Sequence, residues 1–404
     1  MVFGEPAVAA ALSDLRITVK VTPLTTARVR IRMPDLPTPI DVTFNSMNLR
    51  LSMLHEPPIK TDAELIQRCI LNQRPLLDAL SVSALVPLIY LTNRLTLGHL
   101  DTGLDVHVRS HDLPVGAGLG SSAAFGVACA AALLRLSLLL PSSLPPPPLG
   151  RPSLEQLEII NKYSFYSEIL LHGTPSGIDN AVSTFGGAID YTKADGNTTM
   201  EKFDVPPLEL ILANTHVPRS TKLLVASVRN LYEDHPNVVR NILTCMGNIA
   251  RDFRRYHAGQ ETMNCSAQLL TLVRTNQHML SALGVSHPSL DRICVVVDHV
   301  SDGAAAAKLT GAGGGGCAMI VMQPGAKSQQ TAQKIQDALE NKKHAWRFSC
   351  LRSSVGQEGV LWVHPEDFPE MSAVDKGAGV STRKGIVYTA AAISLVAIIL
   401  MRTR

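Results

Sequence analysis

A glycine-rich segment, Pro114 to Ala124, constrains this chain more than any other feature, because it joins two stretches of different periodicity. Leu104 to Arg109 alternates apolar and polar residues and predicts a strand, and the Ala- and Leu-rich stretch from about 121 to 139 predicts a helix. Glycines let the backbone approach an anion closely, and the first turn of a helix attracts phosphate. Ser121 and Ser122, at the helix start, can bind phosphate oxygens or a magnesium ion. The segment predicts phosphate binding, with a plain tight turn as the alternative.

Two common phosphate-binding motifs do not fit this segment. A P-loop needs Lys-Ser or Lys-Thr after its glycines, and neither follows here. A dinucleotide-binding fingerprint that starts at Gly116 would need glycine at the position of Ser121. One that starts at Gly118 meets Ala123, which the looser form tolerates, but no acidic residue follows before Glu155.

The rest of the chain mixes predicted strands and helices without regular βαβ alternation, which predicts an α+β fold. Residues 7 to 54 predict strands, and 64 to 100 predict two helices broken near Pro75 and Pro87. A length of 404 residues suggests two or three domains. The 37 Lys and Arg balance 34 Asp and Glu, which argues against a nucleic-acid-binding protein.

A second segment, 168 to 180, carries two carboxylates. Glu168 lies in the last turn of a predicted helix, Thr174-Pro175-Ser176-Gly177 is turn chemistry, and Asp179 opens the next helix. Taken alone, Asp179 is equally well explained as a capping residue beside Ser176. Next to a phosphate loop, however, one carboxylate can hold magnesium while the other accepts a hydroxyl proton, which is the division of roles that phosphoryl transfer requires.

A third segment, Lys308 to Cys317, contains a run of glycines and leads into the apolar stretch 317 to 322, a predicted buried strand. A flexible linker is the alternative, but the direct join to a buried strand favours a tight, packed loop. Asn214 to Thr221 follows another predicted strand, 208 to 213, and on sequence alone Thr221 is an ordinary N-cap.

The three segments resemble, in order, the signature motifs of the GHMP kinase superfamily, and 172 to 184 most closely resembles the mevalonate kinase family. The resemblance covers roughly residues 2 to 365. It implies a two-domain α+β fold with the active site between the domains, at 1–203 and 204–368, followed by a linker and tail at 369–404. It also implies ATP- and Mg²⁺-dependent phosphorylation of mevalonate to 5-phosphomevalonate by a homodimer, in isoprenoid and sterol synthesis.

The resemblance assigns roles residue by residue. It implies Asp179 as the general base and Glu168 and Ser122 as magnesium ligands. Glu5, Ser176 and Thr221 are implied to bind the substrate or support its pocket, and His172 is interpreted as structural. The positions implied to bind ATP are Gly116, Ala117, Gly118, Leu119, Gly120, Ser121, Ser122, Gly311, Ala312, Gly313 and Gly314.

The N-terminus departs from the family pattern. The family opens with a strand, an Ala-Pro-Gly-Lys turn and Gly-Glu-His, whereas this chain reads Val2-Phe3-Gly4-Glu5-Pro6. Only Glu5 has a counterpart, so the lysine that would stabilise the transferring phosphoryl group is missing. We expect much reduced activity from this chain and an exposed edge in its first sheet.

The C-terminal segment Ile386 to Met401 contains no charged residue. A helix of about 1.5 Å per residue would span about 24 Å there, short of a bilayer core of about 30 Å. Snorkelling of the flanking basic residues makes up the difference, so a tail anchor is predicted over a buried helix. The start lacks a secretory signal and the seven cysteines are dispersed, which predicts a cytoplasmic protein tethered to an intracellular membrane.

Two rival functions follow from the same residues. One is another GHMP kinase, acting on phosphomevalonate or a sugar, although the segment 172 to 184 speaks against it. The other is a membrane-tethered binding protein that kept the fold and lost catalysis together with the family lysine.

Overall fold

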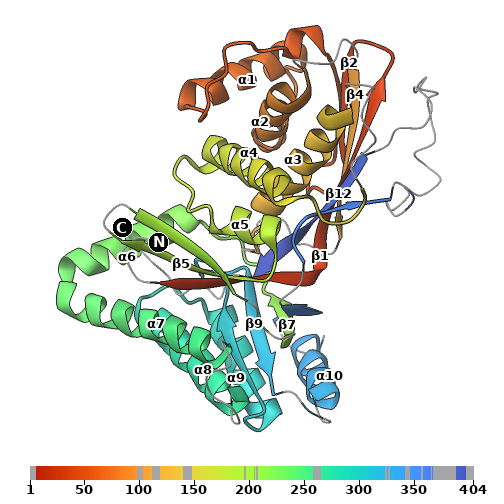
Figure 1. The fold of residues 1–404 in the computed structure, drawn as a ribbon. Helices are drawn as coiled ribbons and strands as arrows, with labels where there is room; N and C mark the ends of the chain where they lie inside the picture. The colour runs from red at the N-terminus through yellow and green to blue at the C-terminus, as the bar shows by residue number, and fades with distance from the viewer. Residues whose placement is uncertain are drawn as a thin grey trace.

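The computed structural model describes residues 6–97, 103–111, 119–139, 148–194, 197–203, 205, 208–257, 265–323, 325, 328–341, 346–355, 358–364, 366 and 388–396. One sheet runs through the molecule, with a group of helices on each of its two parts (Figure 1). The strands of its main path are β1 Ala7–Leu24, β2 Arg28–Met33, β3 Ile40–Asn45, β4 Gly103–His111, β7 Leu208–Asn214, β8 Ala305–Leu309, β9 Cys317–Met322 and β10 Ser349–Val355. Their order is β3-β2-β4-β1-β10-β7-β9-β8.

The long strand β1 joins the two parts of the sheet. Its second half pairs antiparallel with β4, from Arg16 opposite His111 to Leu24 opposite Gly103. Its first residues pair with β5 (Ala188–Ala194), which forms a ladder with β6 (Asn197–Phe203). Between these two stretches, Leu12 pairs with Val355 of β10. Since β1 is largely buried along its 18 residues, it carries the core from one part into the other.

The helices of the first part are α1 Lys60–Gln73, α2 Ala79–Thr92, α3 Ser121–Leu139, α4 Leu154–His172 and α5 Ile178–Phe185, with short helices at Met47–Leu49 and Asn93–Leu97. The predicted α3 is confirmed. Helix α3 packs on β1 and α4, and Gly126 permits the close approach, because a Cβ there would lie 2.4 Å from Ser167 Oγ. Helix α4 begins with a capping box, in which Ser153 Oγ accepts from Gln156 N–H and Gln156 Oε1 accepts from Ser153 N–H.

The predicted break near Pro87 is wrong, because α2 continues through this residue. A proline inside a helix costs about 3 kcal/mol. Most residues from Ser81 to Thr92 are buried, and tertiary burial of this kind outweighs local propensity.

The second part carries α6 Thr221–Asp234, α7 Pro236–His257, α8 Cys265–Ala282, α9 Pro288–Ser301 and α10 Ser328–Leu339. Helices α8 and α9 pack against β8, and α10 packs against α9. The predicted strands at 208 to 213 and 317 to 322 are confirmed as β7 and β9, and every residue of β9 is buried. The interspersed helices and strands confirm the α+β class.

The described part of the predicted tail-anchor helix is a strand instead, β12 Tyr388–Val396. It pairs antiparallel with β1, from Arg16 opposite Ile393 to Val21 opposite Tyr388, and with β11 (Leu361–Val363). An uncharged segment can form a helix or a strand. Here it forms a strand, because the N–H and C=O groups of β1 that face away from β4 are hydrogen-bond partners for it. The same pairing covers the edge of the first sheet that the sequence predicts to be exposed.

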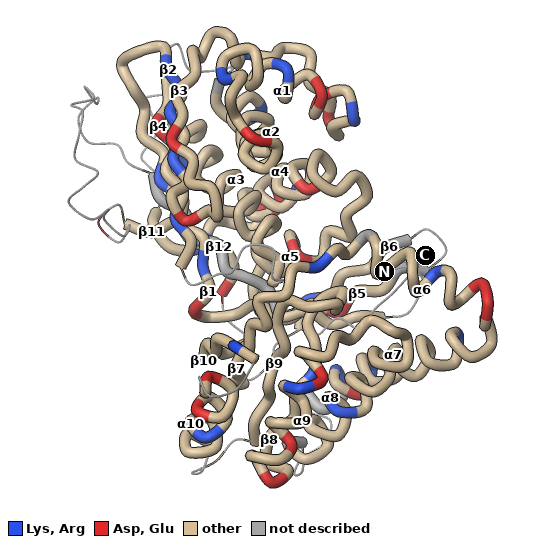
Figure 2. Tube along the Cα trace, turned by 180° about the vertical axis from the view of Figure 1, so that it is seen from behind, with Lys and Arg blue, Asp and Glu red and all other residues tan. Residues whose placement is uncertain are grey.

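Two helical stretches of the described residues are long and apolar enough to cross a membrane, Ala79–Thr96 and Ser121–Leu138. They are 67% and 72% buried inside the fold, which is typical of core helices. Charged residues of both signs occur along the chain in both parts of the fold (Figure 2). On the ladder of β2, β3 and β4, arginines pair with aspartates: Arg30 lies 2.7 Å from Asp41, and Arg32 lies 2.7 Å from Asp105.

Candidate active site

The structure brings Glu168 and Asp179 together across the turn between α4 and α5. The turn has glycines at both ends, Gly173 with φ 76° and Gly177 with φ 81°. These positive φ values favour glycine, and a Cβ on Gly177 would lie 3.2 Å from the Phe165 ring. Glycine therefore lets the chain reverse tightly enough for the last turn of α4 to face the first turn of α5.

Ser122 joins Glu168 because α3 and α4 are in close contact. Ser122 Oγ donates a hydrogen bond to Glu168 Oε2 at 3.3 Å. Glu168 is only 5% exposed, and burial raises its pKa to about 7, while the bond from Ser122 lowers it. The fold therefore brings Ser122 and Glu168, the two residues that the resemblance implies as magnesium ligands, within hydrogen-bond distance of each other.

The surroundings of Asp179 disfavour a negative charge on its carboxylate. Burial, followed by the neighbouring Glu168, raises the pKa of Asp179 to about 7, while Arg219 and His172 lower it. Asp179 Oδ1 and Glu168 Oε1 are buried and have no hydrogen-bond partner among the described residues. Buried polar atoms of this kind normally have partners, so these two oxygens are free for a ligand, an ion or a proton.

Arg219 is a site residue that the sequence interpretation missed. It lies in the segment between β7 and α6, and its guanidinium interacts electrostatically with Asp179. Its Nε and Nη1 are buried without a hydrogen-bond partner in the described part of the chain. In the sequence Arg219 is an ordinary arginine of the segment 214 to 221, and nothing in that segment indicates Asp179 as its neighbour. Asp179 belongs to the first part of the fold and Arg219 to the second, so the site joins both.

The third glycine segment is the tight, packed loop that the sequence predicts. Gly314 N–H donates to Val285 O at 2.8 Å and Gly316 N–H donates to Val217 O at 3.0 Å. A Cβ on Gly313 would lie 2.0 Å from Val285 O, which excludes any larger residue. Because Val217 is two residues before Arg219, the loop also supports the segment that faces Asp179.

A pocket of about 410 Å³ opens beside the start of α3. Ser121 and Ser122 line one side of it, and His172 lies near Glu168 on the other. The remaining wall is largely apolar and comes from β1, β2, β4, α2, α3 and the turn after β2. It includes Ile17, Met33, Leu36, Pro37, Ala84, Pro87, Val108 and Phe125. A mostly apolar hollow with a few polar groups at one end is typical of a small-molecule site.

Three further residues singled out in the sequence, Ser176, Thr221 and His172, are also described by the structure. Ser176 Oγ accepts a hydrogen bond from Ile178 N–H at 3.3 Å, but the N-cap of α5 is Gly177, not Ser176. Thr221 is not an N-cap either: Ser220 caps α6, and Thr221 is exposed at its first position. His172 Nε2 lies 3.6 Å from Glu168 Oε2, and its side chain is about half exposed.

Part of the predicted phosphate loop is described. Leu119 is buried, and Gly120 has a φ of 69° directly before α3. Gly116, Ala117, Gly118 and Glu5 lie outside the described residues.

The oxygens available for a cation are those of Ser122 and Glu168. Among the described residues, no three His, Cys, Asp or Glu side chains cluster as a metal site would require. Magnesium is usually held by one or two carboxylates together with substrate phosphates. The buried, unpartnered Glu168 Oε1 beside a hydroxyl therefore fits a magnesium ion that arrives with a phosphate-bearing ligand.

Family models match both parts of the chain. Residues 87–187 match the GHMP kinases N terminal domain, and residues 262–345 match the GHMP kinases C terminal domain. Mevalonate kinase of Candida albicans is 32% identical over 393 residues, covering 91% of this chain and 87% of that one. Human mevalonate kinase is 40% identical over 261 residues, but the match covers 64% of this chain and spans only 63% of the human protein's length.

Solved structures show the same fold. A Leishmania major mevalonate kinase in complex with R-mevalonate superposes with a TM-score of 0.62 at 21% identity, over 88% of this chain and 91% of that one. Mevalonate kinase of Methanococcus jannaschii gives a TM-score of 0.61 at 18% identity, over 88% and 92%.

Proposed function

Because this chain belongs to the mevalonate kinase family of the GHMP kinases, we propose that it transfers the γ-phosphate of ATP to the C5 hydroxyl of mevalonate. The product is 5-phosphomevalonate, which serves isoprenoid and sterol synthesis. The observation that carries the proposal is the pair of carboxylates Glu168 and Asp179, each with one buried oxygen that has no partner among the described residues, beside the start of α3 and opposite Arg219.

The residues divide the work of phosphoryl transfer among them. Asp179, with a pKa raised to about 7 by burial and by Glu168, accepts the hydroxyl proton as the oxygen attacks phosphorus. Glu168 and Ser122 are the residues that would hold magnesium, which neutralises charge on the phosphates when it is bound. The Arg219 guanidinium supplies positive charge at the same place.

The nucleotide base fits the pocket beside α3. The start of α3 offers N–H groups and the hydroxyls of Ser121 and Ser122 to phosphates, and the apolar wall of the pocket adjoins them. ATP would therefore lie with its phosphates toward Glu168 and its base between α2 and β2. The glycine loop supports the opposite side of the site, because Gly316 binds Thr215 and Val217 of the segment that carries Arg219.

The test is turnover of ATP with purified protein and R-mevalonate. Replacement of Asp179 by Asn should lower kcat by about 100-fold or more while nucleotide binding persists, because only the proton acceptor is lost. Asp234→Asn, at an exposed position at the end of α6, is the matched control. Absence of turnover in the unchanged chain, with nucleotide still bound, would favour the binding-protein alternative. The same assay tests the expectation that activity is reduced because the family lysine is missing. The turnover of this chain is compared with that of a version that has the family-type N-terminus, which we expect to be faster.

Substrate choice is tested in parallel. We expect mevalonate to be phosphorylated in preference to phosphomevalonate and galactose, since 172 to 184 resembles the mevalonate kinase signature. A higher kcat/KM for either of the other two acceptors would assign the chain to a different branch of the superfamily. Sedimentation of the purified protein tests the homodimer that the family implies.

We place the reaction in the cytoplasm. The tail-anchor prediction for 386 to 401 competes with the pairing of β12 with β1, because a strand inside the sheet is not available to a bilayer. Carbonate extraction of membranes from cells that express the full chain, or one that ends at Arg383, separates the alternatives. Retention of the full chain alone would support anchoring, whereas release of both would exclude it.

A further inference from the structure

The residue that opens the third glycine loop is held by two buried side chains. Leu309 ends β8, the outermost strand of the sheet path, and faces Ala318 of β9. The next residue, Thr310, donates its N–H to Cys317 O of β9 at 3.0 Å. Since successive residues of a strand point their main-chain groups to opposite sides, Leu309 points its N–H and C=O away from β9, where the described part of the chain adds no further strand to the sheet.

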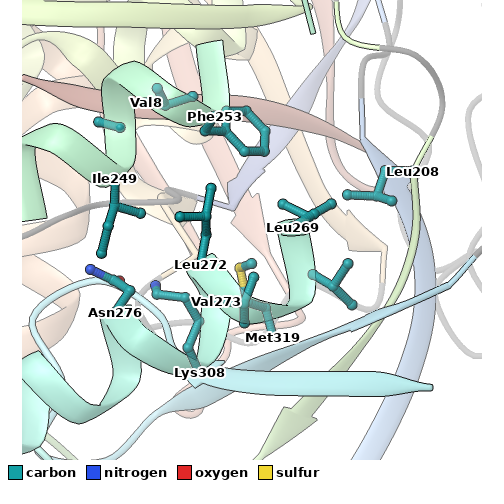
Figure 3. A pocket seen from close by; sticks show the side chains of 12 residues that line it. Val8, Leu208, Ile249, Phe253, Leu269, Leu272, Val273, Asn276, Lys308 and Met319 are labelled. Atoms are coloured by element: carbon teal, nitrogen blue, oxygen red, sulfur yellow. The ribbon is translucent and has the colours of Figure 1, made fainter. Parts of the chain in front are cut away.

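Gln277 and Lys308 take the place of that missing strand. Leu309 N–H donates to Gln277 Oε1 at 2.8 Å, and Lys308 Nζ donates to Leu309 O at 2.7 Å. Gln277 is 5% exposed and Lys308 is 1% exposed. Lys308 lines a small cavity of about 20 Å³ between α7, α8 and the sheet, together with Asn276 of α8 (Figure 3). The rest of that cavity is apolar, so the ammonium has few alternatives to the carbonyl.

The other end of the Gln277 amide binds the turn that supports the middle of the loop. Gln277 Nε2 lies 3.3 Å from Ser281 Oγ and 3.3 Å from Ser286 Oγ, and Ser286 Oγ donates to Asp291 at 2.6 Å. Between these serines, Val285 O accepts the N–H of Gly314 at 2.8 Å. The Gln277 side chain therefore binds Leu309 at the start of the loop directly. Through the two serines it also holds the turn that contains Val285, whose carbonyl binds Gly314 in the middle of the loop.

The loop passes this constraint on to the site. Gly316 binds Val217 O through its N–H, and its own carbonyl accepts from Thr215 N–H at 2.8 Å and from Thr215 Oγ1 at 2.7 Å. Arg219, opposite Asp179, follows directly on this segment. We propose that Gln277 is a positioning residue for phosphoryl transfer: it fixes the glycine loop Gly311 to Gly316, and through it the segment that carries Arg219. Only the expected effect on kinase activity rests on the proposed function; the effect on the loop does not.

The test compares three variants. Gln277→Leu removes the acceptor for Leu309 N–H, and we expect kcat/KM for ATP and mevalonate to fall at least about 10-fold per folded molecule. Gln277→Glu keeps an acceptor oxygen for Leu309 N–H at the same place, and Ser281 Oγ can donate to its other oxygen, so it should restore most of the activity. Gln268→Leu, at an exposed position on the same helix, should leave activity unchanged.

A second readout does not depend on activity. Amide hydrogen exchange at Gly314 and Gly316 should speed up at least about 10-fold in Gln277→Leu and stay unchanged in Gln268→Leu, because their acceptors would no longer be held in place. If the unchanged chain lacks kinase activity, the proposed function fails while this measurement still tests the inference. Unchanged exchange, or a lower Tm with normal kcat and KM, would show that Gln277 is structural only. Equal impairment of Gln277→Glu and Gln277→Leu would overturn the role given to the acceptor oxygen.

Discussion

At the scale of single residues, Asp179 should set the pH dependence of the reaction. Its pKa is raised to about 7, so it loses its proton, and becomes able to act as a base, as the pH rises through that value. We expect kcat/KM for mevalonate to increase about tenfold per pH unit below about 7 and to level off above it. A profile measured from about pH 5.5 to about pH 8.5 checks this, and a flat profile would contradict the assignment of Asp179 as base.

Arg219 should change both the height and the position of that profile. Its charge lowers the pKa of Asp179 and stabilises the transferring phosphoryl group in the proposed reaction. Arg219→Met should lower kcat by about 100-fold or more and shift the acidic limb to higher pH, whereas Arg219→Lys should lose less. Arg229→Met, at an exposed position on α6, is the control. An unshifted limb would show that Arg219 does not act on Asp179.

At the scale of elements, β12 should be part of the stable fold. It covers the side of β1 that faces away from β4, from Arg16 to Val21. A chain that ends at Ile386 should unfold at a lower temperature and aggregate more readily, because β1 would expose unpaired N–H and C=O groups. A chain shortened only to Ile398, just beyond β12, is the control. Equal melting temperatures for both truncated chains would mean that β12 contributes nothing to stability.

At the scale of the whole molecule, the shared strand β1 should make the two parts unfold together. Trp362 is 1% exposed and pairs with β12, while Trp346 is 41% exposed and lies just before β10 in the second part. Variants that keep only one tryptophan report on one part each. We expect their urea unfolding midpoints to coincide, since β1 pairs with β4 in one part and with β10 in the other. Separated midpoints would show two independently stable units, with the predicted boundary near residue 203.

The elements and the main site residues could be predicted from local patterns. The loop before α3, the capping box of α4, the buried strand β9 and the carboxylates Glu168 and Asp179 are all visible in short stretches of chain, because turn chemistry and hydrophobic periodicity act over a few residues. Pro87, by contrast, lies inside a helix because burial of its neighbours outweighs the local cost. Arg219 and Gln277 have no local signal, since their partners lie 40 and 32 positions away in the chain.

The sequence by itself determined that this chain carries two glycine-rich segments and, between them, a turn flanked by two carboxylates, in the order of the GHMP kinase signatures, with an uncharged stretch near the end. The tertiary structure alone decided that residues 388–396 of the uncharged stretch are a strand of the sheet, that Arg219 of the second part faces Asp179 of the first, and that a glutamine holds the edge of β8. The physical reason is the same in each case. A main-chain group or a buried charge takes whichever partner the fold brings within reach, and sequence distance does not limit that choice.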